Sequence, residues 1–152
     1  MKRKKIRIFF AVCLLLAMTA STAFASTSVS GPRPEYDGYR LADFNGGVYL
    51  IWKGGYKSFI PNADTYNNLF RNWEGIHQAE VLLNQIPATD TLSKGAMLIR
   101  GSNSTNVYLL TNGYKHFIVS VAVMDKYNFD WDKVQTLSQI IVDSIPDGVS
   151  IR

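Results

Sequence analysis

The sequence predicts an α+β fold made of two tandem repeats, each under 60 residues long, packed about a pseudo-twofold axis as a single domain. The first observation is a hairpin pattern that occurs twice: residues 48–60 read VYLIWKGGYKSFI and residues 107–118 read VYLLTNGYKHFI. In both, apolar and β-branched runs flank a Gly-Gly or Asn-Gly turn, which supplies the positive φ that tight hairpins need.

The second observation is that the self-similarity continues beyond the hairpins. It runs in one order to residue 152, at an offset of 59 that falls to 58 after the extra glycine of Gly54-Gly55 and returns to 59 at Ile86-Pro87 after a second one-residue slip. The matched pairs include Tyr56/Tyr114, Lys57/Lys115, Phe59/Phe117, Trp73/Trp131 and Ile86/Ile145. Because similarity at a fixed period indicates a duplicated structural unit, we assign residues 37–93 to repeat 1 and residues 94–152 to repeat 2.

Each repeat is expected to begin with a short strand, at residues 39–41 and 96–99, followed by a polar loop and the hairpin. Asn62 and Ser120 then stand where a helix begins, and their side-chain oxygens suit them to be N-caps. The apolar positions of this first helix recur at three to four residues. They are Ala63, Tyr66, Leu69 and Phe70 in repeat 1, and Val121, Met124 and Tyr127 in repeat 2.

A turn with Trp73 or Trp131 and a brief strand near Ile76 or residues 134–137 come next, and a second short helix follows. Its expected apolar stripe is Ala79, Leu82, Leu83 and Ile86 in repeat 1, and Leu137, Ile140, Ile141 and Ile145 in repeat 2. The helix is expected to end at the Ile-Pro pair, because proline disfavours the α conformation of the residue before it.

Both faces of the first hairpin strand carry apolar side chains, which is typical of a sheet covered on both sides. Val48, Leu50 and Trp52 share one face, and Tyr49 and Ile51 share the other. A unit this small buries little alone, so the two repeats are expected to pack together. We expect the helices on one side of a shared or abutting sheet.

The N-terminus resembles a secretory signal peptide. Five basic residues precede the apolar run at residues 8–20, and Ala23-Phe24-Ala25 forms a small-residue cleavage site. Residues 1–25 are therefore predicted to be removed on export, which leaves a secreted or surface-associated protein without a membrane span. An uncleaved anchor helix is the alternative. Residues 26–36, rich in Ser, Pro and Gly, are predicted to be a flexible leader.

Removing the signal changes the charge balance. It takes away five of the 16 basic residues and none of the 12 acidic ones, so 11 basic residues remain against 12 acidic. The basic precursor therefore gives no reason to expect a nucleic-acid partner. The single cysteine, Cys13, also lies in the signal, so the exported chain must be stable without disulfides.

No residue set in the exported chain specifies a catalytic or cofactor chemistry. It lacks cysteine and a Gly-x-Ser-x-Gly elbow, and its only imidazoles are His77 and His116. Asp130-Trp131-Asp132 has oxygen ligands at alternate positions but lacks the further ligands and central glycine of a calcium loop, so turn and capping roles explain it better. We predict no enzyme activity, no metal and no cofactor.

Two other functions stay open as alternatives. One is a small secreted hydrolase that uses carboxylates at the repeat junction, although spacing singles out no pair among the acidic residues. The other is a structural or assembly protein without a small ligand.

A binding surface on the hairpins is the remaining candidate. Trp52 has Thr111 as its partner in repeat 2, so the repeat does not need an indole there. It is interpreted either as a platform for a sugar or peptide or as packing between the repeats. The candidate ligand-binding residues are Tyr49, Trp52, Lys57, Tyr108, Lys115 and His116. Trp73 and Trp131, present in both repeats, are expected in the core.

The combined pattern, VYLL-x-NG-x-K-x-x-I followed by a short helix, an Asp-Trp turn and Ile-Pro-x-Gly, resembles tandem repeats of exported bacterial surface and cell-wall-associated proteins. The resemblance covers residues 37–152, and repeat 1 departs from it at Ala88-Thr89 and at its extra glycine. It implies a non-catalytic module that binds cell-envelope polysaccharide or a surface protein, and it brings no catalytic residues.

Overall fold

The computed structural model describes residues 30–152, so the predicted signal peptide and the first part of the predicted leader lie outside the described residues. Repeat 1 contains β1 (Arg40–Ala42), β2 (Val48–Trp52), β3 (Tyr56–Phe59), α1 (Ala63–Asn67), β4 (Ile76–Gln78) and α2 (Glu80–Gln85). Repeat 2 contains β5 (Met97–Gly101), β6 (Val107–Thr111), β7 (Tyr114–Phe117), α3 (Val121–Lys126), the 3-10 helix η2 (Trp131–Lys133), β8 (Gln135–Leu137) and α4 (Gln139–Ser144). A 3-10 turn, η1 (Pro34–Tyr36), precedes them.

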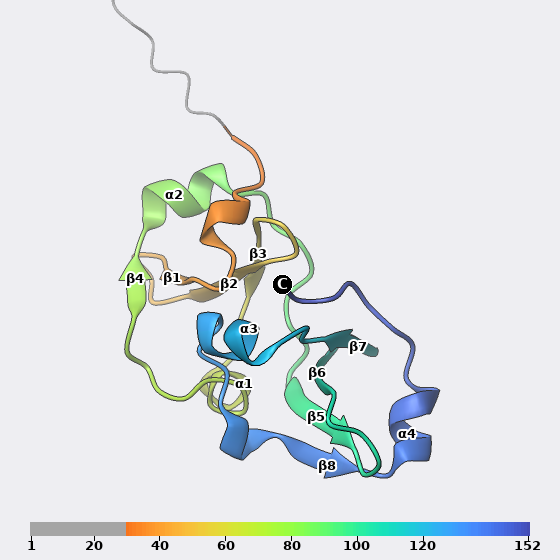
Figure 1. Cartoon of the computed structure of the whole chain (residues 1–152). Helices are drawn as coiled ribbons and strands as arrows, with labels where there is room; N and C mark the ends of the chain where they lie inside the picture. The colour runs from red at the N-terminus through yellow and green to blue at the C-terminus, as the bar shows by residue number, and fades with distance from the viewer. Residues whose placement is uncertain (1–29) are drawn as a thin grey trace, which may run out of the picture.

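The two repeats form separate sheets with the same topology (Figure 1). Their strand orders are β3-β2-β1-β4 and β7-β6-β5-β8, in which only the pairings of β1 with β4 and of β5 with β8 are parallel. The α+β fold with two similar repeat halves is therefore confirmed.

The hairpin turns use the residues that the sequence indicated. Asn112 and Gly113 connect β6 to β7 with φ values of 53° and 79°, and Thr111 pairs with Tyr114. Two central residues with positive φ define the turn whose twist matches paired strands, which explains the Asn-Gly sequence. The turn of repeat 1 is one residue longer.

The predicted helix ends are confirmed. The Asn62 side chain accepts a hydrogen bond from the Thr65 amide at 2.8 Å, and the Ser120 side chain accepts one from the Val123 amide at 3.3 Å. These bonds satisfy amides that have no partner inside the first turn. At the other end, α2 stops at Gln85, where Ile86 before the proline is extended with ψ 124°.

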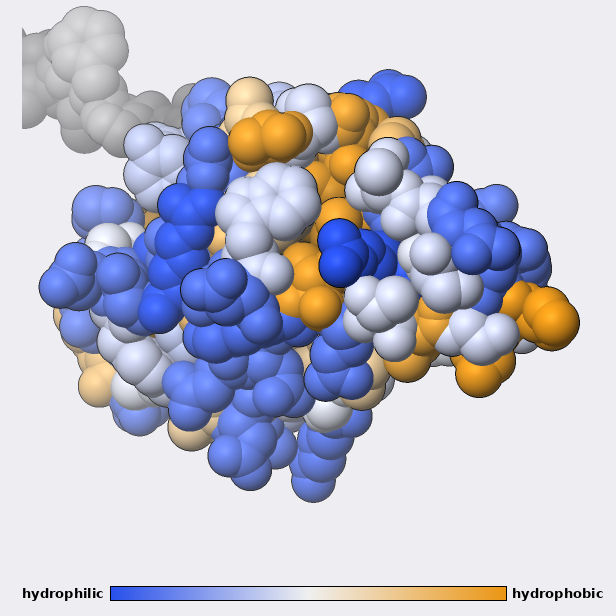
Figure 2. All heavy atoms as spheres, turned by 60° about the horizontal axis from the view of Figure 1, so that its bottom comes forward, coloured by the Kyte–Doolittle hydropathy of each residue, from blue (hydrophilic) through white to orange (hydrophobic). Residues whose placement is uncertain are grey.

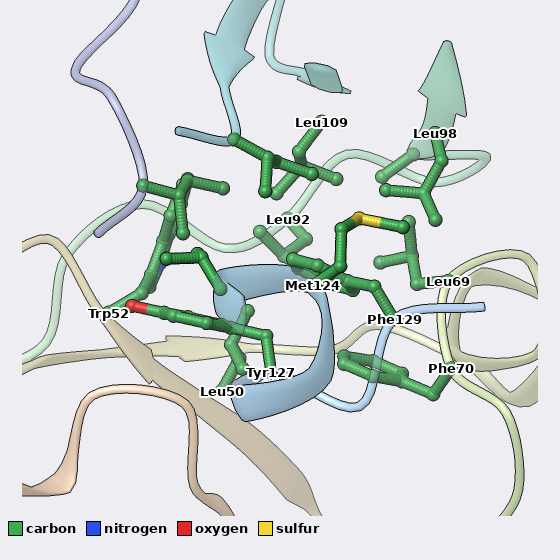
Figure 3. Packing of buried hydrophobic residues seen from close by; sticks show 14 of the residues in the cluster. Leu50, Trp52, Leu69, Phe70, Leu92, Leu98, Leu109, Met124, Tyr127 and Phe129 are labelled. Carbon is green, nitrogen blue, oxygen red and sulfur yellow. The ribbon is translucent and has the colours of Figure 1, made fainter. Parts of the chain in front are cut away.

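A single core joins the two repeats. Helices α1 and α3 lie between the two sheets, and their side chains meet those of both sheets in one cluster (Figures 1 and 3). Phe70 follows α1 and stacks on Phe129, which follows α3, with ring centroids 5.5 Å apart. Each repeat thus buries its apolar face against the other, as two units of this size require.

A second, smaller core lies on the opposite face of the repeat 1 sheet. There α2 packs Leu83 and Ile86 against Leu41 and Ile51. The expectation of helices on one side of a shared or abutting sheet is therefore wrong, because α1 and α2 cover opposite faces of one sheet. The physical reason is the apolar side chain of Ile51, which points away from the central core and needs its own cover.

The predicted stripe of the last helix is also wrong. Ile140 and Ile141 of α4 are exposed, and Val142 is the buried residue. Val142 occupies the place that Leu83 has in α2, so both repeats bury the same position. In the run Ile140-Ile141-Val142, apolar residues are consecutive, and periodicity alone cannot choose which one faces the sheet.

The described part of the predicted flexible leader packs on repeat 1. The Arg33 amide donates to the Gly55 carbonyl at 2.9 Å, and the Gly31 amide donates to the Gln85 carbonyl at 3.0 Å. Gly55 has φ 94°, and a Cβ there would come within 2.1 Å of the Arg33 nitrogen. Only glycine leaves room for this approach, so residues 31–36 belong to the folded unit.

Candidate functional site

The six residues that the sequence nominated do not meet in one groove. The structure places them in three separate environments. Tyr49 lies with Lys57, Tyr108 lies with Lys115, and Trp52 contacts His116 across the repeat junction.

Trp52 belongs to the core. Its side chain is 1% exposed, and its Nε1 donates to the Oγ of Ser58 at 2.6 Å (Figure 3). The interpretation of Trp52 as packing between the repeats therefore holds, and its interpretation as a ligand platform is wrong. A buried indole with a satisfied N–H contributes apolar area and orientation to the core.

His116 is buried beside Trp52. Its Nδ1 lies 2.8 Å from the Val149 carbonyl, to which a protonated Nδ1 donates. Burial lowers the pKa of the imidazole, and the ammonium of Lys53 lowers it further, while the bond to Val149 opposes them. Since desolvation disfavours the charged ring, His116 is held neutral and serves the packing of the junction.

The two lysines support helix ends. Lys57 Nζ donates to the Leu83 carbonyl in α2, and Lys115 Nζ donates to the carbonyl of Ile145, the C-cap of α4. Each ammonium also lies 5.8 or 5.9 Å from the ring centre of its tyrosine neighbour, Tyr49 or Tyr108. A cation near the C-terminal carbonyls of a helix complements their partial negative charge, so both Tyr-Lys pairs stabilise the fold.

A mixed-charge pocket of about 550 Å³ lies at the repeat junction. Asp90 and Asp147 line it together with Lys53 and His116. This is where a carboxylate hydrolase would have to act. Asp147, however, forms an ion pair at 3.2 Å with Lys115, whose ammonium also donates to the Ile145 carbonyl, so this carboxylate has a structural partner at the end of α4.

A pair of equivalent grooves is the most distinctive surface feature. Groove 1, of about 280 Å³, is lined by Gly46, Gly47, Val48, Phe59, Ile60, Pro61, Asn62, Ala63, Tyr66 and Trp73. Groove 2, of about 410 Å³, is lined by Thr105, Asn106, Val107, Phe117, Ile118, Val119, Ser120, Val121, Met124 and Trp131, with Arg100 in addition. Every position that lines groove 1 thus has its repeat equivalent in groove 2.

The tryptophan of groove 1 is fixed but accessible. Trp73 is 49% exposed and stacks on Tyr66, with ring centroids 3.9 Å apart and planes at 21°. Its Nε1 donates to the Asn67 side chain at 2.9 Å. One indole face is therefore supported by the protein while half of the side chain stays in contact with solvent.

Arg40 supports groove 1 from the interior of the protein. Its buried guanidinium donates to the Tyr66 hydroxyl, to the Asn72 carbonyl at 3.0 Å and to the Glu74 carbonyl at 2.7 Å. It thereby ties the tyrosine under Trp73 to the turn that carries Trp73. Burial raises the pKa of Tyr66, and Arg40 partly offsets this.

The tryptophan of groove 2 is held through the backbone on either side of it. Trp131, 43% exposed, is the first residue of η2, and the Asp130 side chain accepts from the Asp132 amide at 3.0 Å. Lys133 pairs with Asp130 at 3.3 Å and donates to the Phe70 carbonyl of the other repeat. The capping interpretation of Asp130 is therefore confirmed, and it serves to position the indole.

Comparison of the chain with protein-family models, with curated proteins and with solved structures gives no match. Its function must accordingly be argued from the geometry of the grooves. Within residues 30–152, no three His, Cys, Asp or Glu side chains gather as a metal site would require, and no helix has the length and apolarity to cross a membrane.

None of the six binding residues predicted from the sequence lines either groove. Trp73 and Trp131 are expected in the core, but both are about half exposed, so that expectation is wrong. Each follows a short connection after its helix, and Asn72 and Asp130 cap the backbone beside them. An aromatic residue kept in both repeats yet placed beside turn-forming residues was the available signal.

Proposed function

We propose that this protein is a non-catalytic binding module that holds cell-envelope polysaccharide in its two tryptophan-rimmed grooves. The observation that carries the proposal is the duplication of a half-exposed indole in two equivalent grooves. Packing alone would explain an aromatic residue at a core position in both repeats. These two tryptophans instead leave about half of their surface in water, and the fold does not require an exposed indole there.

The lining of the grooves favours an uncharged ligand. Among the described residues that line groove 1, the Tyr66 phenol is the only titratable group, and in groove 2 it is the Arg100 guanidinium. A nucleic acid would need several cationic contacts to its phosphates. A sugar ring, which presents an apolar C–H face and a rim of hydroxyls, suits an indole framed by backbone and small polar groups.

The face shown in Figure 2 does not favour a broad protein interface. On the face shown in Figure 2, hydrophobic side chains are visible in patches between hydrophilic ones. A stable protein partner usually covers a continuous, well-packed area of at least about 1,000 Å². Narrow grooves, each with one half-exposed tryptophan, fit an extended chain better than a wide partner.

The described lining of the grooves includes no carboxylate, imidazole or thiol, which are common groups in general acid–base and nucleophilic catalysis. Two of its hydroxyls have structural partners, because Tyr66 donates to the Asn72 carbonyl and Ser120 accepts from the Val123 amide. The proposal is therefore a module that binds without cleaving. Its place outside the cytoplasm follows from the signal-like sequence of residues 1–25.

Co-sedimentation with isolated bacterial cell walls tests the proposal, using the chain from residue 26, which contains the whole described fold. We expect the wild-type protein to pellet with the walls and the double variant Trp73→Ala/Trp131→Ala to stay in solution. Phe44→Ala is the matched control, because Phe44 is an exposed aromatic that lines neither groove. Equal pelleting of the double variant and the wild type would overturn the proposal.

Protease treatment of the walls separates the two possible partners. If polysaccharide is the ligand, walls stripped of protein retain the wild-type chain and the double variant still fails to bind. Loss of binding after stripping would instead point to a surface protein.

A further inference from the structure

The two grooves are related by reciprocal contacts near Phe70 and Phe129. The Arg71 amide donates to the Asn128 carbonyl at 3.1 Å, and the Asp130 amide donates to the Leu69 carbonyl at 2.9 Å. The two segments of the chain run antiparallel here, with Phe70 and Phe129 as the central pair. Equivalent segments that contact each other reciprocally are the mark of a twofold relation.

Side chains add one bond in each direction between the repeats, from cations at positions that are not repeat equivalents. Arg71 Nε donates to the Phe129 carbonyl at 3.0 Å, and Lys133 Nζ donates to the Phe70 carbonyl. Each repeat thus uses a cation to hold the segment of the other that leads to its tryptophan. With the shared core below them, these bonds fix the two grooves relative to each other.

A twofold relation limits what one ligand chain can do. A polysaccharide is directional, because its two ends differ chemically. If the twofold axis is perpendicular to the bound chain, the second groove receives a chain of opposite direction. If the axis is parallel to the bound chain, the second groove lies beside that chain and not along its length. In neither case does one straight chain make the same contacts in both grooves.

We infer that the protein bridges two polysaccharide chains, one in each groove, and so acts as a crosslinker. This inference rests on the function proposed above and adds to it the number and relation of the bound chains. The two grooves carry the same residue types, Val, Phe, Ile and Trp, at four equivalent positions, so each offers a chain the same set of apolar contacts there. One protein molecule that holds a separate polysaccharide chain in each of its two grooves links the chains without any covalent step.

Light scattering from sonicated cell-wall fragments tests the inference. We expect wild-type protein to raise the scattering as fragments join. We expect a smaller rise when protein is in excess, because each site on a fragment then binds its own protein molecule and few molecules bridge two fragments. Trp73→Ala and Trp131→Ala, each with one intact groove, are expected to pellet with whole walls but to leave the scattering of fragments at least fivefold below the wild-type maximum. Sedimentation velocity of the free proteins is the control for self-association, because a dimer of a single variant would carry two intact grooves.

The outcomes separate the two claims. Wild-type protein that pellets with walls but never raises the scattering of fragments would overturn crosslinking and leave the binding function standing. Single variants that crosslink as well as the wild type would also overturn it, because one groove would then be enough. Wild-type protein that fails to pellet would overturn both.

Discussion

Trp52 of repeat 1 meets His116 of repeat 2 edge to face, with ring centroids 5.0 Å apart and planes at 71°. The repeat equivalents of these residues are Thr111 and Ser58. Ser58 in turn accepts the Trp52 indole N–H, and Thr111 receives the Ser93 amide at 2.9 Å. The residues that differ between the repeats thus contact one another where the repeats meet, and these contacts stabilise the junction.

Replacement of Trp52 by Ala should therefore destabilise the protein severely. Deleting a buried indole costs about 3–5 kcal/mol of the free energy of unfolding, and it also leaves Ser58 without its donor. Denaturant unfolding measures the change. Trp73→Ala is the matched control, because it removes the same side chain from a half-exposed site. A Trp52→Ala variant no less stable than Trp73→Ala would contradict the assignment of Trp52 to the core.

Stability should also fall as the pH drops below 6.5. Because burial lowers the pKa of His116 in the folded state from 6.5, the unfolded chain binds the proton more readily in that range. The stabilisation is complete above pH 6.5 and is lost progressively toward the lower folded pKa. Unfolding free energies between pH 7.5 and about 5 measure this, since most carboxylates titrate below that range.

His116→Asn is the control for the pH experiment. Its amide can still donate to the Val149 carbonyl, but it does not titrate. We expect the variant to be less stable near neutral pH and to depend less on pH. An equal pH dependence in the two proteins would show that His116 is not the group responsible.

Local sequence signals accounted for the parts of the fold that local chemistry determines. The Asn112-Gly113 turn, the caps Asn62 and Ser120, and the ends before Pro87 and Pro146 each depend on a few adjacent residues. Such signals keep their meaning in any tertiary context.

Tertiary contacts decided the parts that the sequence did not reveal. Trp73 lies in a turn after α1 and Trp131 begins the single-turn η2, and such short segments have no periodicity to say which side faces the core. Arg40 occupies a strand position whose equivalent in repeat 2 is the buried Leu98, so its burial depends on the carbonyls of a turn more than 30 residues later. Burial of Trp52 likewise required a partner from the other repeat.

Replacement of Arg40 by Leu, the residue at the equivalent position of repeat 2, should loosen groove 1 and leave groove 2 intact. The Tyr66 hydroxyl and the carbonyls of Asn72 and Glu74 lose their shared donor. Loss of a donor to a buried group costs about 1–3 kcal/mol. We expect Trp73 to become more accessible to acrylamide quenching, measured in a Trp131→Phe background.

The binding readout of Arg40→Leu distinguishes positioning from simple destabilisation. Combined with Trp131→Ala, it should abolish pelleting with cell walls, because neither groove is then complete. Combined with Trp73→Ala, it should leave the pelleting that groove 2 supports. Equal losses in the two combinations would mean that Arg40 acts on the whole fold.

The shared core predicts that the two repeats unfold together. Leu50 and Leu69 of repeat 1 and Leu109 and Met124 of repeat 2 belong to one buried cluster, so neither repeat keeps its apolar cover when the other unfolds (Figure 3). Removing one N-cap, by Asn62→Ala in repeat 1 or Ser120→Ala in repeat 2, should lower the free energy of unfolding by about 1 kcal/mol.

Each cap variant should shift a single transition by that amount, whether it is followed by circular dichroism or by tryptophan fluorescence. The losses should add in the double variant, because the two caps share no hydrogen-bond partner. Repeats that unfolded independently would instead give two transitions, of which Asn62→Ala would shift only one. Coincident transitions by both probes therefore test whether the duplicated halves form one cooperative unit.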